Sequence, residues 1–497
     1  MKSPIKSMCI LLGLWLLLRV IFFEGLWGFD DLFHANFALH PKSHPANHWE
    51  SRLLFNSALA LSIRLFGFKE WVLALPGLIG SLAFVMASWW TGRKLWDEVT
   101  GFLSGIFACF LVLDITHASY PVANSLANGF CAVGTSMVLL ADKRRSLSLI
   151  GGLLLGISIF THLSFLFYVG IFALAVSLKE WPPLLEWRRG SLVFIIAFVG
   201  FLTLNFSLYA ILTGNPLYEF SVVSKTHLSN QNFAVPLRLS SGEINPAWIW
   251  WPFINLVFSK AFGILISLSV VMAILKWPKL EMSLRLITLT ILMYWAYASF
   301  GSQHPFRYLP LDHDTRYWYP LALPACLLMA GMLKSHVKTN RWRFGGVALI
   351  VTINIILLLL SGNWGQNVEI SKELLHYANM SPDSFFVTDP YTYDEMFILQ
   401  GGNPPKNIGL LIGAKASFSH LDDSYYRSPE DPSLKILYNP LQEWRPRHLV
   451  LSANVKRQEI APPRYRMIAY LFPHSFRERF SQLIRKPAAQ LITLENH

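Results

Sequence analysis

Charge is scarce in this sequence: only 14% of its 497 residues are Asp, Glu, Lys or Arg, whereas a soluble globular chain carries about 25%. Hydrophobic residues make up 53%. This balance excludes a disordered chain, a collagen-like fibre and an ordinary soluble enzyme. Cysteine is also rare, and the four cysteines lie in apolar runs without CxxC or His/Cys ligand spacing. We expect them to be small buried apolar side chains and not a disulfide framework or a zinc site.

Long apolar runs dominate the sequence instead. A spanning helix needs about 20 mostly apolar residues, and eleven stretches qualify, the shortest with help from flanking residues. They are residues 8–24, 71–92, 100–114, 122–141, 147–162, 163–178, 191–212, 256–275, 285–300, 317–333 and 346–361. The sequence therefore predicts an α-helical polytopic membrane protein with about eleven transmembrane helices. No cleavage site follows the first stretch, so we interpret it as an uncleaved anchor and not a signal peptide.

Basic residues fall on alternate connections between these stretches. The 42 Lys and Arg exceed the 30 Asp and Glu, giving a net charge of +12, which alone would suit a nucleic-acid partner. The positive-inside rule explains the excess without nucleic acid, because every basic cluster lies on one side if the N-terminus is inside. The clusters lie at residues 2–6, 93–94, 143–145, 179–189, 276–285 and 334–343. We expect an inner-membrane protein with its N-terminus in the cytoplasm.

The chain divides into two predicted domains. Residues 1–361 form the transmembrane domain, and residues 362–497 turn polar and nearly neutral. Runs such as 385–388 and 448–451 are typical of strands, and Asp, Pro, Gly and Asn turn signals separate them. We expect this tail to be a small soluble α/β domain on the extracytoplasmic face.

The most informative segment is GFDDLFHANFA at residues 28–38, just beyond the outer end of the first apolar stretch. If a helix begins near Phe29, Asp30 and His34 lie four residues apart on one face. A carboxylate at the membrane surface can act as a general base, while its neighbour Asp31 orients the acceptor or holds a metal. The alternative is structural, because acidic residues commonly cap helix starts.

The acidic pair resembles a feature of the membrane glycosyltransferases of family 39, which include the protein O-mannosyltransferases and, more loosely, the lipid A aminoarabinose transferases. The likeness continues through LFGFKE at 65–70, LPG at 75–77, GRKLW at 92–96 and TRYWYPLALP at 315–324. The resemblance implies the GT-C fold and a sugar donor on a polyprenyl-phosphate carrier. It also implies that Asp30 is the catalytic base and Asp31 its acidic partner.

Two departures from the family pattern concern the acceptor and metal use. The family often has an acidic residue in the second outer connection, where this chain has Asn124. Asp114, at the end of the preceding stretch, is our candidate to supply that charge near the substrate. The family also usually has an arginine before its Leu-Pro step, and Ala74 stands there. A divalent metal therefore stays open, and we name no cofactor.

The fourth outer connection carries a dense charged group. It contains His304, Arg307, Asp312, His313, Asp314 and Arg316. A lipid-linked phosphodiester needs cations, and arginine binds phosphate in a bidentate manner. We therefore place Arg307, Arg316, Asp312 and Asp314 with His34 in the substrate site. In the alternative, the two arginines merely pair with the two aspartates at the interface.

Two other polar features have simpler explanations. His34, His40, His44 and His48 are spaced as metal ligands would be on a helix, but Pro41 and Pro45 interrupt that helix. A polar loop or substrate contacts are the preferred interpretation over zinc. Arg19, near the outer end of the first stretch, is expected to snorkel to the interface.

The leading functional hypothesis is an inverting membrane glycosyltransferase, which moves a hexosyl or pentosyl group from polyprenyl phosphate to a protein, lipid A or another glycan. The absence of Walker A and Rossmann fingerprints agrees with a lipid-linked donor. The alternative is a transporter or lipid flippase, for which repeated halves and midplane ionisable groups would be expected. A non-catalytic membrane subunit that binds a glycan is a third possibility. Neither sugar nor acceptor follows from the sequence.

Overall fold

The computed structural model describes residues 4–23, 25–28, 30–42, 44–141, 144–179, 189–229, 264–301, 315–337, 339–360, 366–412, 414–415, 417–418, 423–428, 434–439, 455–460 and 490–494. They form two compact units. The first comprises Met1–Val20, Ser43–Ala58 and Ala74–Leu359, and the second Ile21–Lys42, Leu59–Leu73 and Leu360–His497. The predicted domain boundary after residue 361 stays a prediction.

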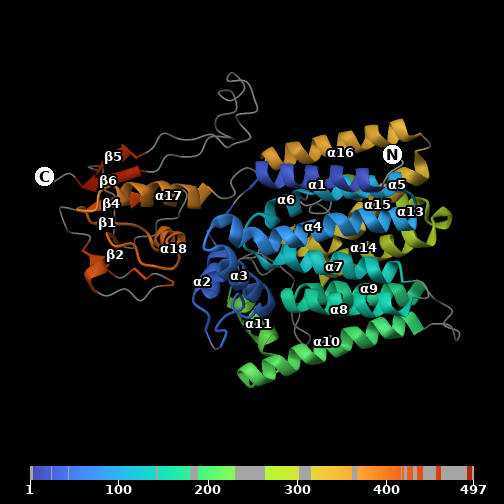
Figure 1. Ribbon diagram of the computed structural model, residues 1–497, viewed down its shortest axis with the longest axis horizontal. Helices are drawn as coiled ribbons and strands as arrows, with labels where there is room; N and C mark the ends of the chain where they lie inside the picture. The colour runs from blue at the N-terminus through green and yellow to red at the C-terminus, as the bar shows by residue number, and fades with distance from the viewer. Residues whose placement is uncertain are drawn as a thin grey trace, which may run out of the picture. The chain divides into compact units, whose positions relative to one another are not determined.

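The first unit is helical (Figure 1). Its helices are α1 (Pro4–Ile21), α5 (Glu98–Cys109), α6 (Val112–Ala118), α7 (Ala123–Leu139), α8 (Arg145–Thr161), α9 (Phe165–Lys179), α10 (Arg189–Thr213), α11 (Tyr218–Ser229), α13 (Ile264–Leu275), η1 (Trp277–Lys279), α14 (Met282–Phe300), η2 (Thr315–Leu321), α15 (Ala322–His336) and α16 (Asn340–Leu360). Two further helices, α3 (Leu53–Phe66) and α4 (Glu70–Leu95), have residues in both units.

Several helices have the length and composition of membrane spans. Among the described residues, three pass this test singly: Pro4–Ile21, Glu70–Leu95 and Val193–Thr213. Helices α5 and α6 pass it together and are bent by 54° at the break between them. Each stretch that we predict from the sequence overlaps a described helix. The number that cross a membrane stays a prediction.

Small residues let helices of the first unit pack closely. A Cβ placed on Gly129 of α7 would lie 2.6 Å from the Cα of Gly80 on α4. The two backbones therefore approach as closely as small-residue interfaces in membranes allow. Helix α8 packs against α7 and α10, and α15 packs against α5, α13 and α14. Without a hydrophobic driving force in lipid, such close packing is what holds helices together.

The second unit contains helices α2 (Asp30–Leu39), α17 (Gln366–Asn379), α18 (Pro390–Leu399) and η3 (Asp423–Tyr425), together with a six-stranded mixed sheet of order β3-β2-β1-β4-β6-β5. The strands are β1 (Phe386–Val387), β2 (Ile408–Leu411), β3 (Tyr426–Arg427), β4 (Lys435–Tyr438), β5 (Val455–Glu459) and β6 (Gln490–Leu494). Neighbours among β1 to β4 are parallel, with Phe386 beside Ile408 and Val387 beside Ile436. Strand β6 pairs antiparallel with β4 and β5.

Buried apolar residues on these strands and directly before β4 form the core of the sheet. They are Val387, Leu411, Leu434, Ile436 and Ile492, and Phe385 and Tyr438 pack beside them. The predicted strand at 385–388 corresponds to β1, whereas the one at 448–451 lies outside the described residues.

The four cysteines do not all behave as expected. All are free thiols, and Cys109, Cys131 and Cys326 are buried. Cys9 on α1 is exposed, so the expectation of burial was wrong for this one residue. An apolar helix near a chain end packs only one side against its neighbours, so an apolar run alone does not decide burial.

Candidate functional site

The acidic pair begins a helix, as the sequence predicts. Helix α2 starts at Asp30, which is partly exposed, while Asp31 is fully buried. The Asp31 carboxylate accepts hydrogen bonds from the backbone N–H groups of Trp27 and Gly28, and both of its oxygens lie 3.1 Å from the Gly28 nitrogen. Carboxylates in a first helical turn also favour the helix dipole. Asp31 thus holds the preceding loop, and Asp30 is the more accessible carboxylate.

The loop before α2 depends on glycine. Gly25 and Gly28 have φ angles of +74° and +106°, which L side chains rarely adopt. The turn at Gly28 points its N–H group at Asp31. The sequence therefore folds the chain back immediately before the acidic pair.

His34 lies one turn beyond Asp30 and is fully buried. The predicted spacing on one helix is confirmed, because both residues belong to α2. The predicted contact of His34 with substrate stays a prediction.

Helix α2 packs against the C-terminal helix α18 within the second unit. The rings of Phe33 and Phe418 meet edge to face with centroids 5.0 Å apart. At the other end of α2, His40 Nε2 lies 3.3 Å from the Gly402 carbonyl oxygen. Residues near position 400 therefore surround the helix that carries the acidic pair, which no local sequence pattern indicates.

Asp114 lies at the centre of a buried polar cluster in the first unit. Its carboxylate forms an ion pair with Arg19 and accepts hydrogen bonds from the Ser81 hydroxyl at 2.5 Å and from the Tyr319 hydroxyl at 2.6 Å. Asp114 and Ser81 are fully buried, and Arg19 is 2% exposed. The predicted role of Asp114 in substrate binding stays a prediction, and here its two oxygens are bound to protein groups.

Arg19 does not snorkel, so that expectation was wrong. Its guanidinium also donates to the Cys109 carbonyl at 2.7 Å and to Ser81 Oγ at 3.0 Å. A charged group inside an apolar bundle is stable only when paired and hydrogen-bonded. A charged residue inside the first apolar stretch, and not at its end as Glu24 is, was the signal that could have revealed this pair.

Arg316 lies in η2, where it is partly buried and its guanidinium sits 5.8 Å from the centroid of the Tyr317 ring. The Tyr317 carbonyl accepts a 2.7 Å hydrogen bond from Tyr294. Arg307, Asp312 and Asp314 lie outside the described residues, and their predicted roles stay predictions.

The sequence also raised the possibility that the histidines of the first outer connection bind a metal. No three His, Cys, Asp or Glu side chains gather in the described part of the chain in a way that would hold a metal ion. The rings of His48 and Trp49 lie against each other at a tilt of 39°, with centroids 3.8 Å apart.

Burial raises the pKa values of acidic groups outside the predicted spans, and Asp394 and Glu219 are two of them. Burial raises the pKa of Asp394 on α18 to about 6, although hydrogen bonds from Ser417 oppose the shift. Burial also raises the pKa of Glu219 on α11 to about 8, and Arg52 and Asn205 oppose this shift. Both groups therefore retain a proton more readily than an ordinary carboxyl.

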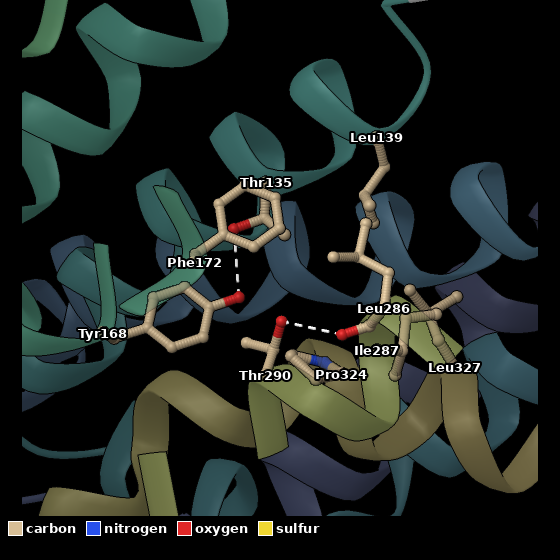
Figure 2. A pocket seen from close by; sticks show the side chains of 9 residues that line it. All are labelled: Thr135, Leu139, Tyr168, Phe172, Leu286, Ile287, Thr290, Pro324 and Leu327. Carbon is tan, nitrogen blue, oxygen red and sulfur yellow. Dashed lines mark hydrogen bonds between the residues drawn. The ribbon is translucent and has the colours of Figure 1, made fainter. Parts of the chain in front are cut away.

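An apolar crevice lies among α7, α9, α14 and α15 of the first unit (Figure 2). It is lined by Thr135, Leu139, Tyr168, Phe172, Leu286, Ile287, Thr290, Pro324 and Leu327. The Thr135 and Tyr168 hydroxyls are 3.3 Å apart, and Thr290 donates to the Leu286 carbonyl of its own helix. The space suits about one water molecule, which is far smaller than a sugar.

No family model and no curated protein sequence matches this chain. Solved structures do match it. The structure of ArnT from Cupriavidus metallidurans bound to undecaprenyl phosphate aligns with a TM-score of 0.57 and 11% identity, over 99% of this chain and 98% of that chain. The chain has the GT-C fold. The fold implied by the resemblance is therefore confirmed.

Two further GT-C structures agree. ArnT from the same organism in the apo state aligns with a TM-score of 0.53 and 12% identity, over 98% of this chain and 97% of that one. The oligosaccharyltransferase of Archaeoglobus fulgidus, in complex with zinc and sulfate, aligns with a TM-score of 0.50 and 13% identity. That alignment covers 80% of this chain and 61% of the oligosaccharyltransferase. The two-unit organisation thus lies within a GT-C fold that extends over nearly the whole chain.

Proposed function

We propose that this chain is an integral membrane glycosyltransferase, which moves a sugar from a polyprenyl-phosphate carrier to an acceptor on the extracytoplasmic face. The observation that carries the proposal is the alignment of 99% of the chain with ArnT, whose structure was determined with undecaprenyl phosphate bound. The acidic pair at the start of α2 supplies the chemical group that such a transfer needs.

In this proposal Asp30 is the general base. It takes the proton from an acceptor hydroxyl or amine, and the acceptor atom attacks the anomeric carbon from the face opposite the phosphate. The bond between the anomeric carbon and the phosphate oxygen breaks, and polyprenyl phosphate leaves with the electron pair. Because a phosphate is already a stabilised anion, no acid catalyst is required. The configuration at the anomeric carbon is inverted.

The geometry of α2 supports a division of roles between the two acids. Asp31 is fully buried and bound to backbone N–H groups, so it orients the loop and the first turn of the helix. Asp30 is partly exposed and can approach an acceptor. The start of the helix fixes the backbone from which the Asp30 carboxylate extends, and positioning of a catalytic group lowers the entropy cost of the reaction.

The negatively charged donor phosphate needs cationic side chains to bind it. We propose that Arg316 and Arg307 are these side chains. Arg316 belongs to the charged fourth connection and lies in η2. Arginine binds a phosphate with two parallel hydrogen bonds and stabilises the charge that develops as the phosphate leaves. In this arrangement the aspartates of the same connection, Asp312 and Asp314, orient the arginines or contact the sugar.

A donor-turnover assay tests the function. The purified protein is reconstituted into vesicles with undecaprenyl phosphate carrying a radiolabelled hexose, pentose or amino sugar, and cell-envelope extract supplies the acceptor. We expect one donor to be consumed with release of undecaprenyl phosphate. Native mass spectrometry measures binding of undecaprenyl phosphate to the same protein. The proposal fails if the protein neither consumes a donor nor binds undecaprenyl phosphate. Movement of the lipid-linked sugar across the vesicle membrane, without transfer of its sugar, would favour the flippase alternative.

A further inference from the structure

The glycine turn before the acidic pair lies between two carboxylates of the second unit. On one side, the Gly28 N–H donates to Asp31, which belongs to α2. On the other side, a Cβ placed on Gly28 would overlap Oε1 of Glu395 on α18 and would come within 3.7 Å of Val368. The φ of +106° favours glycine at residue 28, and the absence of a Cβ there leaves room for the Glu395 carboxylate close to the Gly28 Cα.

Glu395 is itself held in place. It is fully buried, and its Oε2 accepts a hydrogen bond from the hydroxyl of Ser371 on α17. The side-chain amide of Asn439, at the end of β4, approaches Ser371 Oγ at 3.5 Å. Ser371 and Asn439 are both fully buried. A chain of polar contacts thus leads from the sheet through α17 and α18 to the turn at Gly28.

A carboxyl group at this position is costly unless it makes specific contacts. Burying a carboxylate without compensation is strongly unfavourable, and an apolar side chain of the same volume would fill the space at lower cost. The contacts that distinguish Glu395 from such a side chain are its hydrogen bond with Ser371 and its approach to the Gly28 backbone. Both fix the turn relative to α18.

We propose that Glu395 is a positioning residue for the catalytic pair: by packing against Gly28 it sets where α2 begins and therefore where the Asp30 carboxylate points. Asp30 lies two residues beyond Gly28, at the first position of α2. The inference rests on the proposed function insofar as Asp30 is the base. It gives the C-terminal part of the chain an indirect part in catalysis, through the position of the Asp30 carboxylate.

Asp394 provides a matched control on the same helix. Like Glu395 it is a buried acid of α18, at 3% exposure. Its two oxygens each lie 3.0 Å from the Ser417 backbone nitrogen, and the atoms nearest to a Cβ placed on Gly28 belong to Glu395 and Val368, not to Asp394. Variants at the two positions therefore both lose a buried carboxyl, but only those at Glu395 release the turn.

The first experiment measures hydrogen exchange of the segment 25–30 in the full-length protein in detergent. Glu395→Ala removes the contact with Gly28, so the N–H groups of Trp27 and Gly28, which are bonded to Asp31, should exchange about tenfold faster or more. Asp394→Asn should leave their exchange unchanged. Unchanged exchange in Glu395→Ala, or an equal increase in both variants, overturns the proposal. This readout does not depend on transferase activity.

The second experiment measures kinetics with the donor identified by the turnover assay. Misplacing a catalytic group by about 1 Å can cost up to about a hundredfold in rate. We expect Glu395→Ala to lower kcat about tenfold or more at an unchanged KM for the donor. Glu395→Gln keeps the length of the side chain and an oxygen for Ser371, so it should recover most of kcat and also covers the case in which the alanine variant folds poorly. Asp394→Asn should keep wild-type kcat.

The two hypotheses fail in different ways. If Asp30→Asn retains full turnover, the assignment of the base is wrong, while the exchange experiment still reports whether Glu395 holds the turn. If Asp30→Asn is inactive but Glu395→Ala keeps wild-type kcat, or Glu395→Gln loses as much kcat as is expected of Glu395→Ala, the positioning role is wrong and the proposed function stands. Faster exchange with unchanged kcat likewise overturns the positioning role.

Discussion

The Tyr319 hydroxyl donates a 2.6 Å hydrogen bond to Oδ1 of Asp114, a residue 205 positions earlier in the chain. The other carboxylate oxygen, Oδ2, accepts from Ser81 and pairs with Arg19. One carboxylate therefore joins α1, α4, α6 and η2 inside the first unit. Because η2 also carries Arg316, this cluster bears on the proposed donor site.

Removing one partner of the Arg19–Asp114 ion pair should destabilise the protein more than replacing both partners with apolar residues. Arg19→Met leaves a buried charge without its partner, which typically costs about 3–5 kcal/mol. Replacing both residues, as in Arg19→Met with Asp114→Leu, should recover much of that loss because no charge stays buried. Thermal unfolding in detergent measures both variants. A double variant as unstable as the single one would contradict this account.

Removing the Tyr319 hydroxyl should destabilise the protein less than Arg19→Met does. Tyr319→Phe deletes one hydrogen bond to a buried carboxylate, which is worth roughly 1–3 kcal/mol. Thr91→Val is a suitable control, because it removes a 2.6 Å hydrogen bond to Ser136 elsewhere in the same bundle. We expect Tyr319→Phe to lower the melting temperature more than Thr91→Val. Equal losses would mean that the charge on Asp114 adds nothing to the bond.

Asp30→Asn should abolish sugar transfer while leaving the protein inserted and folded. A general base typically contributes about 10²–10⁴-fold in rate, and its loss should lower kcat and not donor affinity. Asp31→Asn should cost less activity but more stability, because Asn offers one acceptor oxygen where the carboxylate offers two to Trp27 and Gly28. Turnover and melting temperature are measured on both. Near-normal turnover in both variants would make the acidic pair structural.

Arg316→Ala should weaken use of the lipid-linked donor more than use of the acceptor. The guanidinium is the proposed ligand of the donor phosphate, and truncation removes its charge and both hydrogen bonds. We expect a higher KM for the donor, with Arg307→Ala tested alongside. Arg285→Ala, in the predicted cytoplasmic cluster, is the control. If neither Arg316→Ala nor Arg307→Ala alters the KM for the donor, these arginines do not hold the phosphate.

Glu219→Gln should stabilise the protein at pH 8 more than at pH 5. The folded pKa of Glu219, about 8, lies above its ordinary value of 4.5 because the side chain is buried. The folded state therefore binds more protons than the unfolded state between these pH values, and stability falls as pH rises through this window. Gln mimics the protonated acid and removes that fall. Melting temperatures of both proteins across pH 4–9 test this, and parallel curves would contradict it.

Reporter fusions test the predicted topology. A fusion after Arg145 should report a cytoplasmic location and a fusion after Gly362 an extracytoplasmic one, because the basic clusters alternate with the apolar stretches. A cytoplasmic reporter after Gly362 would place the second unit on the wrong face for the proposed reaction.

The apolar helices and the start of α2 could be predicted from the amino-acid sequence alone. Apolar stretches such as 191–212 predict α10 because hydrophobicity over about 20 residues is a local property. Asp30 and Asp31 predict a helix start for the same reason, since capping and the dipole act within one turn. The order of short motifs from residue 65 to residue 324 was enough to indicate the GT-C fold.

The contacts between polar groups could not be predicted from the sequence and came from the packing of distant segments. Arg19 has the same local sequence whether it snorkels or pairs with Asp114, 95 positions away. Glu395 belongs to an ordinary short helix until α18 packs beside the turn at Gly28. Such contacts join segments far apart in the sequence, and hydrophobic periodicity does not indicate which distant segments meet. Packing and the cost of leaving a buried charge unpaired decide which contacts form.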